Sequence, residues 1–210
     1  MQKRTYDNSQ REKKASATRT AILQALAEQL VTNNAPEFSV AEAAKRAGVS
    51  TRTVFRHFPT REHMLEGVSS WVQEITGRVP HPVAPTDLQD VVVASHRMFD
   101  EHAELMRALL LSDLGRGIRS RLSSRRRKAI SDAIDPVVAR LEPAQGEAVK
   151  ALMGHLMTAE TWWQLRDGFG IPGEEATRVV VWGLRLMIEA LERGDHAFEL
   201  PTGSSADSAT

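Results

Sequence analysis

Residues 39–58 read SVAEAAKRAGVSTRTVFRHF, and this stretch decides the fold. Ser39, followed three residues later by Glu42, is a capping box, so a helix is expected to begin here. Gly48 is placed to end that helix, because the residue at this position often needs a positive φ. Ser50 is a favourable N-cap for a second short helix. Two short helices joined by a tight turn predict a helix-turn-helix motif.

The spacing of small and apolar residues within the motif predicts how its two helices pack. Ala44 is small where the second helix must cross closely, and Val54, ten residues later, is expected to fill the core between the helices. Phe58 is expected to point inward as well. The other face of the second helix is polar and basic, and no acidic residue lies between residues 43 and 61. Such a helix can enter the major groove of DNA with its N-terminal residues at the base edges.

Residues 17–66 resemble the DNA-binding domain of the TetR/AcrR family of bacterial transcriptional regulators. The resemblance rests on three segments, TRTAILQALAEQL, FSVAEAAKRAGVSTRTVFRHF and FPTREHMLEGV. It implies binding to a DNA operator, with a phosphate contact from Arg61, where family members usually carry Lys. The residues that the resemblance assigns to DNA binding are Ser39, Thr51, Arg52, Thr53, Phe55, Arg56, His57 and Arg61.

The remaining chain also repeats its apolar residues with a helical period, so the sequence predicts an all-α fold. We expect an N-terminal helix-turn-helix domain joined to a C-terminal helical domain for ligand binding and dimerisation. The expected ranges are a flexible basic arm at 1–16, the DNA-binding domain at 17–78, the C-terminal domain at 86–193 and a disordered tail at 194–210. Prolines at 80, 82 and 85 mark the linker between the two domains.

The composition of the 210 residues is that of an ordinary soluble protein, with 41% apolar and 26% charged residues. No apolar stretch is long enough to span a membrane and there is no Cys, so a cytoplasmic protein is the simplest reading. The net charge is zero, but residues 1–67 hold 11 Lys or Arg against 7 Asp or Glu. This basic first third suits a polyanion partner, although a chance fluctuation of a few charges explains it equally well.

The resemblance implies that residues 86–193 bind a small-molecule effector and form a homodimer. The last helix, at about 174–193, is apolar nearly all round, and with the helix at about 143–167 it would form a four-helix interface with a second subunit. Burial of the last helix inside one subunit is the alternative. A stripe of Met and aromatic residues usually forms ordinary core, and the alternative is a pocket lining with the candidates Met98, Phe99, His102, Met106, Trp162, Trp163 and Phe169.

A basic run extends from Arg116 to Lys128 without an acid inside it. It predicts either a solvated helix face or an anion site for an acidic or phosphate-bearing effector. Gly115 and Gly117 predict a loop at 112–117, and Pro136 predicts a kink or restart in the helix that follows.

The sequence motifs of several enzyme classes are absent, including HExxH, GxxxxGK and Glu-x-x-His. His96 and Asp100 lie four residues apart and could share a metal, but two ligands without a third are typical of a solvated pair. We therefore expect no catalytic residue, no cofactor and no metal. The sequence favours a ligand-released homodimeric repressor of a pseudo-palindromic operator. An activator of the same fold, an all-α enzyme and a helical interaction module remain the alternatives.

Overall fold

The computed structural model describes residues 8–33, 38–77 and 79–194, and all regular structure within these ranges is helical. The all-α fold predicted from the sequence is therefore confirmed. In chain order the helices are α1 (Asn8–Asn33), α2 (Val40–Arg46), α3 (Thr51–His57), α4 (Arg61–Thr76), α5 (Asp87–Glu101), α6 (Ala103–Leu111), α7 (Asp113–Val138), α8 (Pro143–Leu156), α9 (Ala159–Trp163), the π-helical turn η1 (Gln164–Gly168) and α10 (Gly173–Arg193).

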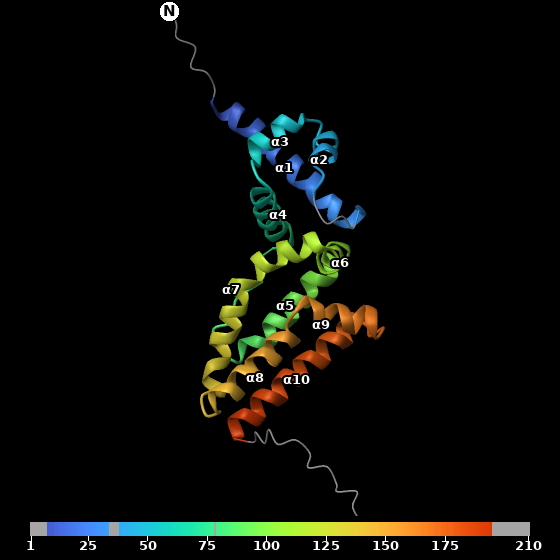
Figure 1. Ribbon diagram of the computed structural model, residues 1–210. Helices are drawn as coiled ribbons and strands as arrows, with labels where there is room; N and C mark the ends of the chain where they lie inside the picture. Colours follow the sequence, from blue (N-terminus) through green and yellow to red (C-terminus); the bar gives the residue numbers. More distant parts are fainter. Residues whose placement is uncertain (1–7, 34–37, 78, 195–210) are drawn as a thin grey trace, which may run out of the picture.

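Figure 1 shows α1 to α3 grouped at one end of the molecule and α5 to α10 forming the other end. The long helix α4 leads from the first group towards the second and packs against α7, while α1 packs against α6. In the second group α10 lies along α5, and α7 lies along α8. The α2–α3 pair is therefore carried at the tip, on helices that also contact the C-terminal region.

Two clusters of buried side chains hold the helices together, and the first crosses between the two ends. This upper core combines residues of α1–α4 with residues of α5, α6, α7 and α9, including Leu26, Phe58, Val68, Met106, Leu109, Leu114, Ile118 and Trp162. The lower core lies among α5, α7, α8 and α10. Each buried Leu, Ile or Phe contributes about 1.5–3 kcal/mol relative to exposure. Helices α1–α4 therefore share one continuous core with the C-terminal region.

Helix α1 begins earlier than the sequence predicted. It starts at Asn8, so residues 8–16 of the expected flexible arm are helical. This segment contains Gln, Arg, Glu, Lys and Ala, which favour helix, and has neither Gly nor Pro to stop it. Extending an existing helix costs little once the packed turns around Ile22 and Leu26 have formed. Residues 1–7 and 195–210 of the expected arm and tail lie outside the described residues.

The loop predicted at residues 112–117 is wrong, because α7 begins at Asp113 and runs through both glycines. The Ser112 hydroxyl caps the helix by accepting from the Gly115 amide at 3.0 Å. A Cβ at Gly115 would collide with the backbone of Leu109, so this glycine permits a close contact with the end of α6. The same helix also continues past Pro136 to Val138, so it does not restart there.

The single helix predicted at 143–167 is divided in the structure. It stops at Leu156, and Thr158, in an extended conformation, caps the new helix α9 by accepting from the Thr161 amide at 3.3 Å. The π-helical turn η1 then follows α9 directly. A local capping residue thus overrides an apolar period that reads as continuous.

Candidate nucleic-acid interface

The α2–α3 pair has the local geometry that the sequence predicted. The Ser39 hydroxyl accepts from the Glu42 amide at 3.3 Å and begins α2. Gly48 has φ of 65°, a left-handed conformation that any side chain would strain. The Ser50 hydroxyl accepts from the Thr53 amide at 3.2 Å and begins α3. The helix-turn-helix is therefore defined by two caps and one positive φ.

The inner face of α3 is anchored by two fully buried side chains. Val54 packs within the upper core together with Ala44 of α2, and Phe58 caps the end of α3 in the same core. Phe58 is held closely, because a Cβ at Gly67 of α4 would lie 2.6 Å from its ring and 2.9 Å from Leu23 of α1. The absence of a side chain at Gly67 thus lets α3 dock on both long helices.

The outer face of α3 presents its polar and basic side chains to solvent. Thr51, Arg52, Phe55 and Arg56 are exposed, and the ring of Phe55 retains 49% of its accessible surface. Neither Arg52 nor Arg56 forms a hydrogen bond or ion pair with any described residue. Both guanidinium groups are therefore available for bidentate contacts with guanine or for contacts with phosphate.

Thr53 and His57 stand at the edges of this face and are only partly exposed. The Thr53 hydroxyl lies 3.0 Å from the Ser50 hydroxyl, so part of its hydrogen-bonding capacity belongs to the helix cap. Burial lowers the pKa of His57, and the charges of Arg56 and Arg19 lower it further. Both effects favour the neutral imidazole, whereas a bound phosphate would raise its pKa.

Ser39 and Arg61 stand at the N-terminal ends of the helices before and after α3. Both residues are exposed, and α4 begins at Arg61 after the Thr60 hydroxyl accepts from the His63 amide at 3.4 Å. A helix N-terminus carries a partial positive charge and suits a phosphate, so Arg61 adds a full charge to a favourable place. The eight residues predicted for DNA binding thus lie on α3 and at these two helix starts.

Sequence reasoning missed two residues that support the motif. Gln29 of α1 is 2% exposed, and its amide makes two hydrogen bonds to the backbone of Ser39, at 2.8 and 3.0 Å. Arg19 of α1 places its guanidinium 4.5 Å from the centre of the Phe58 ring. The one sequence signal for Gln29 is a polar residue on the otherwise apolar stripe of α1, whereas no local pattern marks Arg19.

Comparison with known proteins now identifies the domain. Residues 22–68 match the family model described as bacterial regulatory proteins, tetR family. The N-terminal domain belongs to the TetR family. The match covers the later part of α1, the α2–α3 pair and the first half of α4, so the TetR-type domain includes the geometry described above.

The curated relatives are similar to the N-terminal part of this chain. A nucleoid occlusion factor SlmA from Marinomonas sp. is 39% identical over 61 residues, which cover 29% of this chain and 31% of the relative. The nucleoid occlusion factor SlmA of Vibrio cholerae is 44% identical over 57 residues, or 27% of this chain and 29% of the relative. The chain thus matches less than a third of the length of either relative. No solved structure gives a significant match.

The structure does not gather the seven candidate pocket residues around one cavity. Phe99, Met106 and Trp162 are buried in the upper core, and Met98, His102 and Trp163 are partly buried. Phe169 is 69% exposed. Phe99 and Trp162 do form a tilted aromatic pair, with ring centres 5.5 Å apart. The assignment of these residues to a ligand site stays a prediction.

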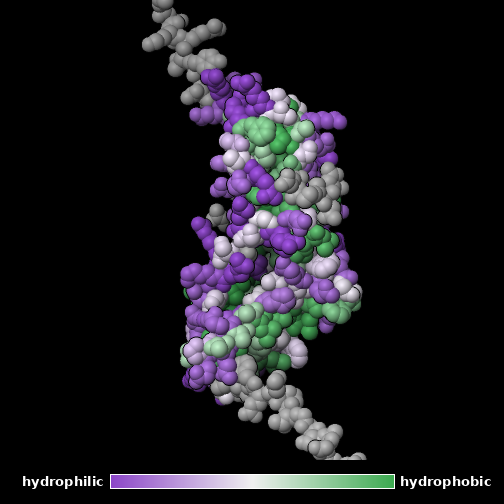
Figure 2. Space-filling view, in the orientation of Figure 1, coloured by the Kyte–Doolittle hydropathy of each residue, from purple (hydrophilic) through white to green (hydrophobic). Residues whose placement is uncertain are grey.

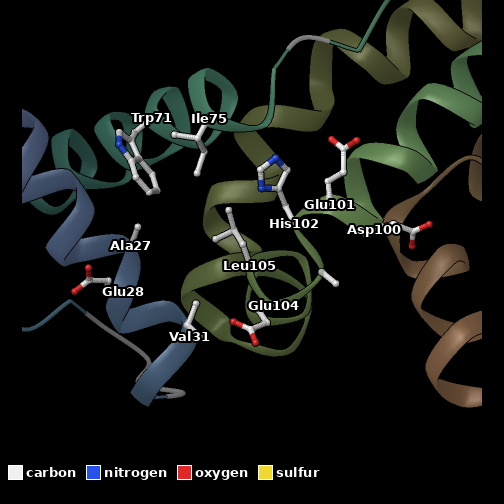
Figure 3. Close-up of a pocket in the computed structure, with 11 residues that line it drawn as sticks. Ala27, Glu28, Val31, Trp71, Ile75, Asp100, Glu101, His102, Glu104 and Leu105 are labelled. Carbon is white, nitrogen blue, oxygen red and sulfur yellow. The ribbon is translucent and has the colours of Figure 1, made fainter.

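An open cleft of about 510 Å³ lies between α1, α4 and the corner where α5 meets α6. Figure 3 shows Trp71 and Ile75 of α4 on one side of this cleft and His102 and Leu105 on the other, with Val31 of α1 below them. His102 is the one candidate pocket residue among the residues that line the cleft.

The described ranges contain no group of three or more His, Asp or Glu residues placed to hold a metal ion. His96 and Asp100 have other partners: the His96 ring contacts Thr177, and the Asp100 carboxylate accepts from Trp162 and Arg166. Across residues 8–33, 38–77 and 79–194, every helix falls short of the length and apolarity needed to cross a bilayer.

Proposed function

We propose that this chain is a transcriptional regulator that binds a pseudo-palindromic DNA operator as a homodimer and acts as a repressor released by a small molecule. The observation that carries the proposal is the exposed face of α3. Its two free guanidinium groups project from a helix that Val54 and Phe58 hold rigidly in the core of a TetR-type domain. The likeness to nucleoid occlusion factors covers less than a third of this chain, so it says nothing of most of its helices.

In the proposed complex α3 lies in the major groove, where its exposed side chains meet the base edges. Arg52 and Arg56 supply sequence choice through bidentate contacts with guanine, and Phe55 or the Thr51 methyl contacts thymine methyl groups. Ser39, Arg61 and the edge residues Thr53 and His57 fix the register on the phosphates. Affinity then falls steeply with salt, because each neutralised phosphate releases counterions.

A second stripe of exposed apolar side chains supports the proposed dimer. On α10, Ala176, Val180 and Leu184 are buried, whereas Val179, Trp182 and Leu186 point to solvent, and Trp182 is 53% exposed. Residues 179, 182 and 186 recur with the spacing of one helix face. Figure 2 shows hydrophobic surface over the C-terminal helices, and Leu152 of α8 adds another exposed apolar side chain. A stripe of this size suits an isologous four-helix interface of α8 and α10 with a second copy.

The continuous upper core supports a route from effector to DNA. Helix α4 belongs to the TetR-type domain and packs on α7, and α1 packs on α6. A ligand that shifts α6 or α7 would therefore move the two α3 helices of a dimer relative to each other. For the operator to empty, the ligand must bind the shifted state more tightly than the DNA-bound state. A regulator that binds the operators of bacterial genes acts in the cytoplasm, which is the location that we propose for this protein.

Retention of genomic DNA tests the DNA-binding part of the proposal. The purified full-length chain is incubated with sheared DNA of its source organism at moderate salt, and the retained fragments are sequenced and footprinted. The proposal expects a small set of fragments that share an inverted repeat, protected on two neighbouring major grooves. Uniform retention of all fragments, or of none, would contradict it. A reporter behind a retained promoter then separates repression from activation.

A further inference from the structure

The structure singles out one residue from the basic run between Arg116 and Lys128. Arg125 and Arg127 are exposed, as the reading of a solvated helix face requires. Arg126 instead reaches into the interior, where its guanidinium donates to the Ser95 hydroxyl of α5 and to the Met157 carbonyl, each at 2.9 Å. Burial of the group lowers the pKa of Arg126.

The charge of Arg126 has no carboxylate partner among the described residues. Its two acceptors are neutral, and the ring of Phe99 lies 6.0 Å from the guanidinium carbon. The carboxylate of Asp100 is committed elsewhere, because it accepts from the Trp162 indole at 2.8 Å and from Arg166. A partly buried cation whose two acceptors are neutral is a favourable place for an added negative charge.

His96, next to Ser95 in sequence, is a buried residue with one ring nitrogen that has no hydrogen-bond partner. The residue is 1% exposed, and its Nδ1 lies 3.0 Å from the Thr177 hydroxyl. Because that hydroxyl donates to the Gly173 carbonyl at 2.9 Å, it must accept from Nδ1–H. These two hydrogen bonds place the proton of the neutral ring on Nδ1, so Nε2 can only accept. Nε2 is buried without a hydrogen-bond partner.

These two groups face the same aromatic surroundings. The Phe99 ring centre lies 6.1 Å from the His96 ring and 5.5 Å from the Trp162 ring, and the Arg126 guanidinium lies over the same phenyl group. The cluster thus combines a cationic donor, a neutral acceptor and apolar walls. Native proteins rarely leave buried polar groups unsatisfied, and a bound ligand is one of the ways in which they are satisfied.

We propose that Arg126 and His96 form the polar end of the effector site and that the effector is an organic carboxylate bearing a hydroxyl group. The carboxylate accepts from Arg126, the hydroxyl donates to Nε2 of His96, and the apolar body lies against Phe99 and Trp162. This inference rests on the proposed function, since it names the ligand class of the effector site in the C-terminal region. It also divides the basic run, because Arg126 serves as the anion site while Arg125 and Arg127 stay on the surface.

The test uses benzoate, its 2-, 3- and 4-hydroxy derivatives and the corresponding neutral hydroxybenzamides as probes. Binding to the full chain is measured by calorimetry at pH 7.5, and Trp162 beside Phe99 provides a fluorescence signal. We expect millimolar or tighter binding of at least one hydroxybenzoate, about tenfold tighter than benzoate because of the added hydrogen bond. The hydroxybenzamides should not bind. Failure of every carboxylate to bind, or equal binding of acids and amides, would overturn the proposal.

Matched variants locate the site. Arg126→Gln should abolish carboxylate binding, whereas Arg125→Gln, which changes the exposed neighbour, should leave it unchanged. If Arg126→Gln does not fold, as shown by circular dichroism, His96→Phe provides the second test. It should bind benzoate as the wild type does and lose the tenfold preference for the hydroxyl group. Unchanged preference in His96→Phe would show that the hydroxyl lies elsewhere and would contradict the inference.

DNA binding measured in the same samples separates this inference from the proposed function. If the chain retains its operator but binds no acid, the inference fails and the DNA-binding proposal stands. If an acid binds through Arg126 without weakening operator binding, the ligand site stands and ligand release fails.

Discussion

The side chain of Gln29 in α1 forms hydrogen bonds with both the amide and the carbonyl of Ser39 at the start of α2. Its Nε2 donates to the Ser39 carbonyl at 3.0 Å, and its Oε1 accepts from the Ser39 amide at 2.8 Å. One buried side chain thus satisfies both backbone groups of the residue that begins the helix-turn-helix. The orientation of α2, and through Gly48 that of α3, therefore depends on α1.

Replacement of Gln29 by Leu should loosen the motif while leaving the remaining helices intact. The change removes the hydrogen bond of the Ser39 amide and one of the two that its carbonyl accepts, since the Ala43 amide still donates to that carbonyl, at a cost of about 0.5–1.5 kcal/mol for each bond lost. We expect lower stability in urea unfolding and faster amide exchange in α2 and α3. Gln24→Leu, on the exposed face of α1, is the control. Equal stability and equal amide exchange in both variants would show that the hydrogen bonds between Gln29 and Ser39 do not hold the motif in place.

Gly67→Ala should destabilise the docking of α3. The new methyl group would lie 2.6 Å from the Phe58 ring and 2.9 Å from Leu23, and overpacking of this kind costs about 1–3 kcal/mol. Gly154→Ala in α8 is the matched control, because nothing lies within 4 Å of its new methyl group. That variant should be neutral or more stable by up to about 1 kcal/mol. Thermal melts of the two proteins distinguish a steric effect from a general effect of glycine replacement.

The free energy of unfolding should decrease as the pH is lowered, because His96 is buried in its neutral form. Burial lowers the pKa of His96 to about 4, with Asp100 opposing the shift and Arg126 adding to it. Below pH 6.5 the unfolded chain binds a proton at this residue while the folded chain does not, so the contribution is full above pH 6.5. It is lost as the pH falls towards 4, at roughly 1.4 kcal/mol per unit and about 3 kcal/mol in all.

Urea unfolding from pH 7.5 to 4.5 measures this dependence. His96→Gln should flatten the profile in this range, whereas His81→Gln, at an exposed position, should leave the wild-type slope. An identical slope in His96→Gln would show that other groups cause the acid sensitivity.

The proposed dimer predicts that Trp182→Glu yields a monomer. A charge in the middle of the α10 stripe would have to be desolvated at the interface, which opposes association strongly. Analytical ultracentrifugation at micromolar concentration provides the measurement. Leu111→Glu alters an exposed leucine of α6 outside the stripe and should remain dimeric. A wild type that is already monomeric, or a dimeric Trp182→Glu, would exclude this face as the interface.

The sequence was most informative where a single residue determines local geometry. Gly48, Ser50, Val54 and Phe58 act through a positive φ, a cap and two apolar contacts, and all four behave as predicted. The loop predicted from Gly115 was wrong, because the sequence does not distinguish a glycine needed for close packing from a glycine needed for a turn.

Residues whose roles depend on distant parts of the chain could not be predicted. Arg126 and its neighbours Arg125 and Arg127 are the same residue type, and only the helices packed around α7 decide which one turns inward. Likewise, the backbone amide of Ser39 donates to the side-chain oxygen of Gln29, which lies ten residues earlier on another helix. No short-range pattern contains this information.

The affinity of the chain for a retained operator duplex tests the central claim most directly. Fluorescence anisotropy at moderate salt should show that Arg52→Ala and Arg56→Ala each weaken binding about 5- to 150-fold, the loss expected for one bidentate contact. Arg97→Ala, an exposed arginine on α5, should bind as the wild type does. Wild-type affinity in both α3 variants would show that DNA is bound elsewhere and would contradict the account.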